Sequence, residues 1–252
     1  MQLQPRVLVL GGTAKARELA GLLCAHGDLA VTSSLAGITA EPVAPAGSLR
    51  RGGFAGADEL AAWLRAERIA AVVDATHPFA TGITANVIAA CRATGVPLLV
   101  LRRAEWHPVA GERWHSVADH AAAARLLPEL GSRVFLAIGR TQVAAYAGLD
   151  ELTFLLRSVQ APAPPVPARL HLIIERGPFT VAGDTALLRE HRIEVLVAKN
   201  SGGEETVAKL HAARALGLEV IMIERPRLPE DPTVDIVESV SDAVAWVRHR
   251  CG

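Results

Sequence analysis

Short runs of Val, Ile and Leu recur along this chain, and segments with apolar residues at helical spacing separate them. Strands that alternate with helices in this way form parallel sheets covered by helices on both faces. We therefore predict an α/β fold of two doubly wound, Rossmann-like parallel-sheet domains with a cleft between them. The expected strands are residues 6–10, 29–33, 69–74, 96–101, 134–138, 153–159, 170–174, 195–198 and 220–223, and the expected helices include 14–24, 58–66, 80–94, 119–127, 141–147 and 240–250.

A break in this alternation predicts the domain boundary. Residues 103–115 are mixed in character and contain two tryptophans, with Pro108 and Gly111 as breakers of regular structure. We expect an N-terminal dinucleotide-binding domain over residues 1–105 and a C-terminal α/β domain for substrate or cofactor over residues 106–252. Ser239 and Asp242 have the spacing of a capping box before the final helix, and this helix is the element that would pack back on the N-terminal domain.

Composition limits the partners and the compartment. Half of the residues are hydrophobic, and 26 basic side chains balance 26 acidic ones. Bulk charge therefore does not favour nucleic acid or an anionic membrane, and the apolar runs are too short for a transmembrane helix. The N-terminus lacks a secretory pattern, and the three cysteines lie far apart. We expect a cytoplasmic protein with no nucleic-acid or membrane partner.

Gly11-Gly12-Thr13 lies between the first expected strand and the first expected helix. Glycine lets the backbone approach a phosphate closely, and a helix N-terminus offers N–H groups to an anion. The motif is neither a P-loop nor a complete GxGxxG, because Ala16 and Arg17 occupy the later positions. Its place at the first strand-to-helix junction favours a phosphate contact over a plain tight turn. Gly11, Gly12 and Thr13 are therefore predicted to bind a dinucleotide.

The residues after the second strand favour NADP over NAD. An NAD site carries an acidic residue about 20 positions after the glycines, whereas this region reads Val31-Thr32-Ser33-Ser34. Arg50 and Arg51 follow, beside two glycines. Hydroxyl groups and arginine suit a ribose 2′-phosphate, although these arginines also fit a solvated loop.

Two further groups of residues follow expected strands. Thr76 and His77 come after the third strand, where His77 either contacts a substrate or caps the next helix. In the second half, successive strand ends present cations, which suits a substrate with several carboxylates, although each one alone also fits a solvated terminus. The glycines after Ser201 form a second candidate anion site. These second-half residues are Arg140, Arg157, Arg176, Lys199, Ser201, Gly202 and Gly203.

Familiar nucleophile and metal motifs are missing from the sequence. It contains no GxSxG elbow, no HExxH and no clustered set of His and Cys ligands. We therefore expect no metal site. A chain without a nucleophile of its own fits a cofactor that carries the reactive chemistry itself.

In their order and spacing, these motifs resemble the precorrin-6A reductase family of cobalamin biosynthesis over nearly the whole chain. One departure is Ile38, where many relatives carry arginine, so the cofactor contact is assigned to Arg51 instead. The matching segments are Gly11-Gly12-Thr13, Ser34-Leu35-Ala36-Gly37, Gly52-Gly53-Phe54, Asp74 to Ala80, Leu101-Arg102-Arg103 with Trp106, Gly139-Arg140, Arg157-Ser158, Arg176-Gly177-Pro178-Phe179 and Lys199 to Gly203.

The resemblance implies an NADPH-dependent reductase that adds hydride to one double bond of a carboxylate-rich precorrin macrocycle, with no metal or flavin. Metal-free and cobalt-containing macrocycles both fit, and transfer contacts with neighbouring pathway enzymes are a further implied interaction. His77 and Lys199 are the candidate proton donors. The assigned binding residues are Gly11, Gly12, Thr13, Ser33, Ser34, Arg51 and Thr76 for the cofactor, and Arg140, Arg176, Lys199, Ser201, Gly202 and Gly203 for the substrate.

Two other classes of protein fit the same features. A non-catalytic protein that binds a macrocycle or a nucleotide would also have two α/β domains around a cleft. Another NADP-dependent reductase, or a nucleotide-dependent transferase, would share the fold because fold alone does not fix function. An uncharged substrate would leave the strand-end cations unexplained.

Overall fold

The computed structural model describes residues 4–36 and 45–252. They form two compact units. The first unit runs to Arg103 and also includes Pro226–Gly252, and the second unit is Ala104–Arg225. The second unit therefore ends well before the end of the predicted 106–252 domain, because the C-terminal strand and helix belong to the first unit.

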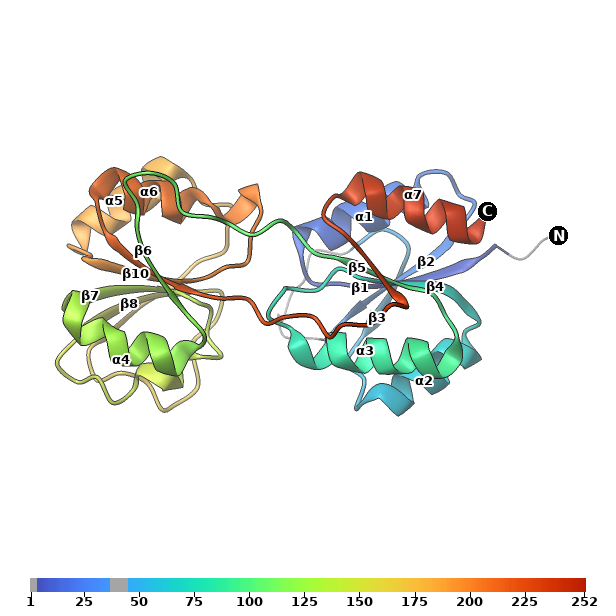
Figure 1. Cartoon of the computed structure of the whole chain (residues 1–252), viewed down its shortest axis with the longest axis horizontal. Coiled ribbons are helices and arrows are strands. Elements are labelled where there is room, and N and C mark those ends of the chain that lie inside the picture. Colours follow the sequence, from blue (N-terminus) through green and yellow to red (C-terminus); the bar gives the residue numbers. More distant parts are fainter. Residues whose placement is uncertain (1–3, 37–44) are drawn as a thin grey trace. The chain divides into compact units, whose positions relative to one another are not determined.

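The first unit is a six-stranded parallel sheet in the order β12-β5-β4-β1-β2-β3. Helices α1 and α7 cover one face, and α2 and α3 cover the other (Figure 1). The elements are β1 (Arg6–Leu10), α1 (Ala14–Cys24), β2 (Ala30–Leu35), β3 (Ser48–Arg51), α2 (Ala57–Ala66), β4 (Ile69–Asp74), α3 (Thr81–Thr94), β5 (Leu98–Leu101), β12 (Val234–Val237) and α7 (Val240–Cys251).

The central strands of this sheet are apolar on both faces, which explains their continuous hydrophobic sequence. In β1, Val7 and Val9 pack with α1 and α7, while Leu8 and Leu10 pack toward α2 and α3. All four side chains are at most 2% exposed. This double-sided core fixes the carboxyl end of β1, where the Gly11-Gly12-Thr13 turn begins.

The second unit is also a six-stranded parallel sheet, in the order β6-β11-β10-β7-β8-β9. Helices α5 and α6 lie on one face, and α4 lies on the other (Figure 1). The elements are β6 (Arg113–Val117), α4 (His120–Leu130), β7 (Arg133–Ala137), the 3₁₀ helix η1 (Val143–Tyr146), β8 (Thr153–Ser158), β9 (Leu170–Ile174), α5 (Val181–Glu190), β10 (Val195–Lys199), the 3₁₀ helix η2 (Glu204–Thr206), α6 (Ala208–Leu216) and β11 (Glu219–Ile223).

The two sheets exchange a strand. β6 follows β5 in the chain but pairs with β11, and β12 follows β11 but pairs with β5. The sequence analysis missed β3, β6 and β12, and the helix expected at 141–147 is the short η1. Within the residues that the structure describes, no helix is long and apolar enough to span a membrane.

Candidate active site

The turn between β1 and α1 has glycine at two positions where a side chain would be disfavoured. Gly12 has a φ of 114°, which side-chain-bearing residues rarely adopt. A Cβ atom on Gly11 would lie 3.3 Å from Cδ2 of Leu35 and 3.4 Å from Cβ of Ala16. The backbone therefore turns tightly against the end of β2. This turn delivers the chain directly into α1.

Thr13 caps α1 through its side chain. Its Oγ1 accepts a hydrogen bond from the backbone N–H of Ala16 at 3.1 Å and donates one to the carbonyl oxygen of Ala75 at 2.9 Å. The hydroxyl proton is thus engaged within the fold. The backbone N–H of Gly11 donates to the carbonyl oxygen of Ser34, so the N–H groups of Gly12 and Thr13 are those that an anion would meet, and the first turn of α1 holds no acidic residue to repel it.

The predicted 2′-phosphate region lies at the ends of β2 and β3. Arg51 stands opposite Leu35 in the parallel pairing, so its exposed side chain belongs to the carboxyl end of β3. Arg50 differs, because its guanidinium stacks 3.7 Å from the centre of the Phe54 ring and bonds to the Gly52 carbonyl oxygen. Arg51 is therefore the arginine of this pair that a ligand can reach.

Ser33 and Ser34 lie inside β2 and are 2% and 6% exposed. The hydroxyl of Ser33 has no hydrogen-bond partner among the described residues. Ile38, at which the sequence departs from the family pattern, lies outside the described residues.

The turn after β4 is organised by a buried carboxylate. Oδ1 of Asp74 accepts hydrogen bonds from the backbone N–H and the hydroxyl of Thr76, and Oδ2 accepts one from the hydroxyl of Thr84. Nδ1 of His77 accepts a hydrogen bond from the backbone N–H of Phe79 at 3.2 Å. Because Nδ1 acts as an acceptor, a neutral His77 carries its proton on Nε2. Thr76 and His77 line one small cavity with Arg102.

The predicted substrate residues of the second unit follow the carboxyl ends of its strands. Arg140 comes after β7, the exposed Arg176 comes after β9, and Lys199 ends β10. Ser201 is 6% exposed. A Cβ atom on Gly202 would lie 2.0 Å from the carbonyl oxygen of Ala104, so this glycine is needed for close packing of the backbone.

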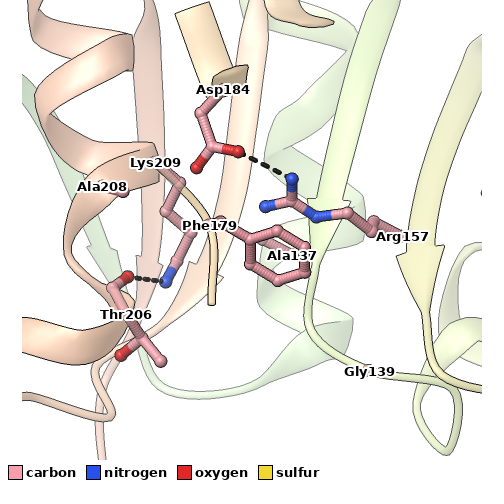
Figure 2. A pocket seen from close by; sticks show the side chains of 8 residues that line it. All are labelled: Ala137, Gly139, Arg157, Phe179, Asp184, Thr206, Ala208 and Lys209. Carbon is pink, nitrogen blue, oxygen red and sulfur yellow. Dashed lines mark hydrogen bonds and ion pairs between the residues drawn. The ribbon is translucent and has the colours of Figure 1, made fainter. Parts of the chain in front are cut away.

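One of the four strand-end cations is buried in an ion pair. Nη1 of Arg157 lies 2.6 Å from Oδ1 of Asp184, and these side chains are 9% and 2% exposed. The guanidinium carbon also lies 3.4 Å from the centre of the Phe179 ring. Figure 2 shows the guanidinium between the carboxylate and this ring. Arg157 is therefore a neutralised, oriented cation rather than part of an open cationic row.

The Arg157–Asp184 pair lines a hollow of about 170 Å³, which we call the Arg157 hollow (Figure 2). Nζ of Lys209 donates to the carbonyl oxygen of Thr206 at 2.5 Å and lies 4.8 Å from the Trp106 ring. Oδ2 of Asp184 is buried, and none of the described residues donates to it. The lining residues are Ala137, Gly139, Arg157, Phe179, Asp184, Thr206, Ala208 and Lys209.

The Arg157 hollow is lined by residues of α5 and α6, and the other face of the sheet, which α4 covers, carries a different set of groups. Leu196 and Ala198 of β10 face the core under α5 and α6, so Lys199 points to the face covered by α4. There, Nδ1 of His120 lies 3.0 Å from the hydroxyl of Tyr146. Burial lowers the pKa of Lys199. Burial, followed by the positive charge of Lys199, lowers the pKa of His120 to about 4.

The sequence analysis missed His120, Tyr146, Asp184 and Lys209. The helix that contains His120 was predicted at residues 119–127, but the partner of His120 was not. The described residues contain no cluster of three or more His, Cys, Asp or Glu side chains that could hold a metal ion.

Comparison with known proteins gives consistent matches. The family model for precorrin-6x reductase CbiJ/CobK matches residues 6–248. The precorrin-6A reductase of Rhodococcus erythropolis is 54% identical over 96% of this chain and 97% of its own length. The precorrin-6A reductase of Mycobacterium tuberculosis is 49% identical over 96% of this chain and 97% of its own length. A solved structure of CobK precorrin-6A reductase superposes with a TM-score of 0.91 at 44% identity, covering 98% of this chain and 97% of that one.

Proposed function

The chain belongs to the precorrin-6x reductase CbiJ/CobK family, and we propose that it uses NADPH to reduce precorrin-6A in cobalamin biosynthesis. Precorrin-6A reduction is an oxidoreductase reaction and requires a reducing cofactor. When bound, NADPH would supply the hydride for the reduction of one electron-poor double bond of the macrocycle. A proton from solvent or from a side chain completes the reduction.

The observation that carries the choice of cofactor is the arrangement at the ends of β1, β2 and β3. The Gly11-Gly12-Thr13 turn leads into α1, which has no acid in its first turn. β2 ends at Leu35 and Ala36 follows it, so neither of these described positions carries a carboxylate that would repel a 2′-phosphate. Arg51 lies directly beside this strand end and is exposed. A phosphate at this position would gain a charge-assisted hydrogen bond from the guanidinium.

The residues present fit NADPH by their donor chemistry. The backbone N–H groups at Gly12 and Thr13 suit the pyrophosphate, because the Thr13 hydroxyl is already engaged. We assign the adenosine end to β2 and β3, with Ser33, Ser34 and Arg51, and the nicotinamide end to Thr76 and His77. His77 Nε2 carries the proton of the neutral ring and can donate it in a hydrogen bond.

For the substrate, we assign the carboxylates to the cations that follow the strands of the second unit. Arg140, Arg176 and Lys199 supply positive charge. The hydroxyl of Ser201 and the backbone N–H groups of the two glycines after it supply uncharged hydrogen-bond donors. In this proposal, the main contribution of the protein to the rate is to position the hydride donor against the acceptor carbon. His77 and Lys199 are the candidate proton donors.

Titration calorimetry with NADPH and with NADH tests this assignment. We expect a clear preference for NADPH. Arg51→Ala should weaken NADPH binding about ten- to a hundredfold and leave NADH binding unchanged, because a hydrogen bond to a charged group contributes about 1.5–3 kcal/mol. Arg50→Ala is the matched control, since this arginine is held by Phe54, and it should leave the ratio of the two affinities unchanged. Equal losses for both nucleotides in Arg51→Ala would contradict the 2′-phosphate contact.

A further inference from the structure

The side chain of Lys199 shares the α4 face of the second sheet with a histidine. His120 is the first residue of α4, directly after the N-cap Asp119, whose carboxylate accepts from the backbone N–H of Ala122. The strand before α4 is β6, so His120 lies at the carboxyl edge of the sheet, as Lys199 does. The ring is half-buried. His120 is thus placed at the same edge as the assigned substrate residues.

Tyr146 holds the His120 ring in a defined orientation. Its side chain is 0% exposed and packs 6.0 Å from the Phe154 ring, centre to centre. The rings of His120 and Tyr146 meet edge-on at 89°, and the hydroxyl lies 3.0 Å from Nδ1. Because η1 places Tyr146 in the core, the position of its hydroxyl is fixed by packing. The imidazole is therefore held by an immobile partner.

The direction of this hydrogen bond follows from the burial of Tyr146. If Nδ1–H donated to the tyrosine oxygen, the buried phenolic proton would need a second acceptor, and the part of the chain that the structure describes supplies only His120. Burying an unsatisfied donor is costly. The hydroxyl therefore donates to Nδ1, and the proton of the neutral imidazole resides on Nε2.

The charges around the ring keep it neutral. Burial and the nearby Lys199 ammonium both disfavour the imidazolium, and the opposing carboxylate of Asp119 is the weaker influence. Burial also raises the pKa of Tyr146, so its hydroxyl stays protonated. A neutral imidazole beside an ammonium avoids the repulsion that a second cation would bring. It can still donate one hydrogen bond.

We propose that His120, fixed in its Nε2–H tautomer by Tyr146, is a further substrate-binding residue that donates to a carboxylate of the macrocycle beside Lys199. Among the described residues, none accepts a hydrogen bond from Nε2. An ammonium and a neutral N–H donor at one strand end can each bind one oxygen of the same carboxylate. The inference rests on the proposed role of Lys199 in binding substrate. Tyr146 is a positioning residue in this arrangement.

Two measurements on the full-length enzyme test the inference. Nitrogen-15 NMR of the imidazoles at neutral pH should show His120 as a neutral Nε2–H tautomer, and Tyr146→Phe should give a mixture of tautomers while retaining the packed ring. In steady-state assays, His120→Ala should raise KM for the macrocycle about tenfold, the loss expected for a hydrogen bond to a charged group, with kcat little changed. His120→Gln, which offers an N–H donor, should recover most of this loss.

The outcomes separate this inference from the proposed function. His171→Ala is the matched control, because this exposed histidine lies on the edge strand β9, and it should leave KM unchanged. An Nδ1–H tautomer in the unaltered enzyme, or an unchanged KM in His120→Ala, would overturn the inference. Failure of the unaltered enzyme to prefer NADPH would overturn the cofactor assignment and leave the NMR result standing.

Discussion

Each unit contains a buried carboxylate, Asp74 at the end of β4 and Asp184 in the first turn of α5, and the two act in different ways. In the first unit, Asp74 accepts three hydrogen bonds from Thr76 and Thr84, so both of its oxygens are satisfied by uncharged neighbours. In the second unit, Asp184 pairs one oxygen with the Arg157 guanidinium, and its other oxygen has no partner among the described residues. The same residue type therefore builds a rigid turn in one unit and orients a cation in the other.

This difference matches the ligands that we assign to the units. A cofactor bound mainly by backbone N–H groups needs a turn of fixed shape, and the Asp74 network keeps such a turn in place after β4. In the second unit, a carboxylate and a ring hold the Arg157 guanidinium in one orientation, while the cations that we assign to the substrate carboxylates follow other strands of the same sheet. The buried carboxylate of the first unit is thus held by uncharged hydrogen-bond donors, and that of the second unit by an ion pair.

The prediction with the largest expected effect concerns the contribution of the Arg157–Asp184 ion pair to the free energy of unfolding. Asp184→Ala leaves the Arg157 guanidinium buried without its main partner, and breaking a buried pair in this way costs about 3–5 kcal/mol. Glu175→Ala is the matched control, because Glu175 is 54% exposed and lies 4.0 Å from the same guanidinium. It should cost less than about 0.5 kcal/mol. Urea unfolding of the two variants measures both values, and equal small losses would show that Arg157 is solvated.

The strands that could be predicted from the sequence are mainly those with continuous apolar runs, because their side chains are buried in the sheet. β1 and β4 are buried on both faces, so their apolar runs identify them. The three missed strands, β3, β6 and β12, all lie at sheet edges. Their sequences, SLRR, RWHSV and VDIV, mix polar and apolar residues, because an edge strand is covered less completely. The pairing partners of β6 and β12 are also distant in the sequence, so no local pattern reveals the exchange of these two strands.

The sequence indicated at which edge of the sheets the candidate site residues lie, but it did not indicate which of these residues contact one another. Residues that follow strands in a parallel sheet must gather at its carboxyl edge, which is why Lys199 and Arg140 could be named from sequence. The Arg157–Asp184 pair joins residues 27 positions apart, and the His120–Tyr146 pair joins residues 26 positions apart. Nothing in either local sequence specifies such a contact. Only tertiary packing shows that one expected cation is neutralised and that a histidine faces Lys199.

A smaller effect is expected in the pH dependence of stability, through the lowered pKa of His120 near Lys199. Burial and the Lys199 ammonium lower the pKa of His120 from its usual 6.5 to about 4. Between these pH values the unfolded chain binds a proton at His120 that the folded protein does not bind, so stability falls as the pH falls. Because the ring is partly exposed, we expect a loss of about 1–2 kcal/mol between pH 7 and pH 5.

Urea unfolding at the two pH values, with His120→Gln for comparison, isolates this contribution. The variant should lose less stability than the unaltered protein over the same interval. Hydrogen bonds lower the pKa values of Glu194 and Glu219 below 4.5, so the loss of their stabilising charge falls below this interval. Parallel pH slopes for the variant and the unaltered protein would show that Lys199 and the protein interior leave His120 free to titrate normally.

The smallest effect compares equivalent helix caps in the two units. Thr13 caps α1 and also donates to the carbonyl oxygen of Ala75, whereas the hydroxyl of Thr180 caps α5 by accepting from the backbone N–H of Gly183. Thr180→Ala should cost about 1 kcal/mol, the usual value of a cap, and Thr13→Ala about 2 kcal/mol, because it also removes a tertiary hydrogen bond. Thr13→Ser keeps the hydroxyl and should recover most of the loss in urea unfolding. Equal losses at the two caps would mean that the bond to Ala75 adds no stability, and that the first unit does not depend on neutral polar contacts more than the second.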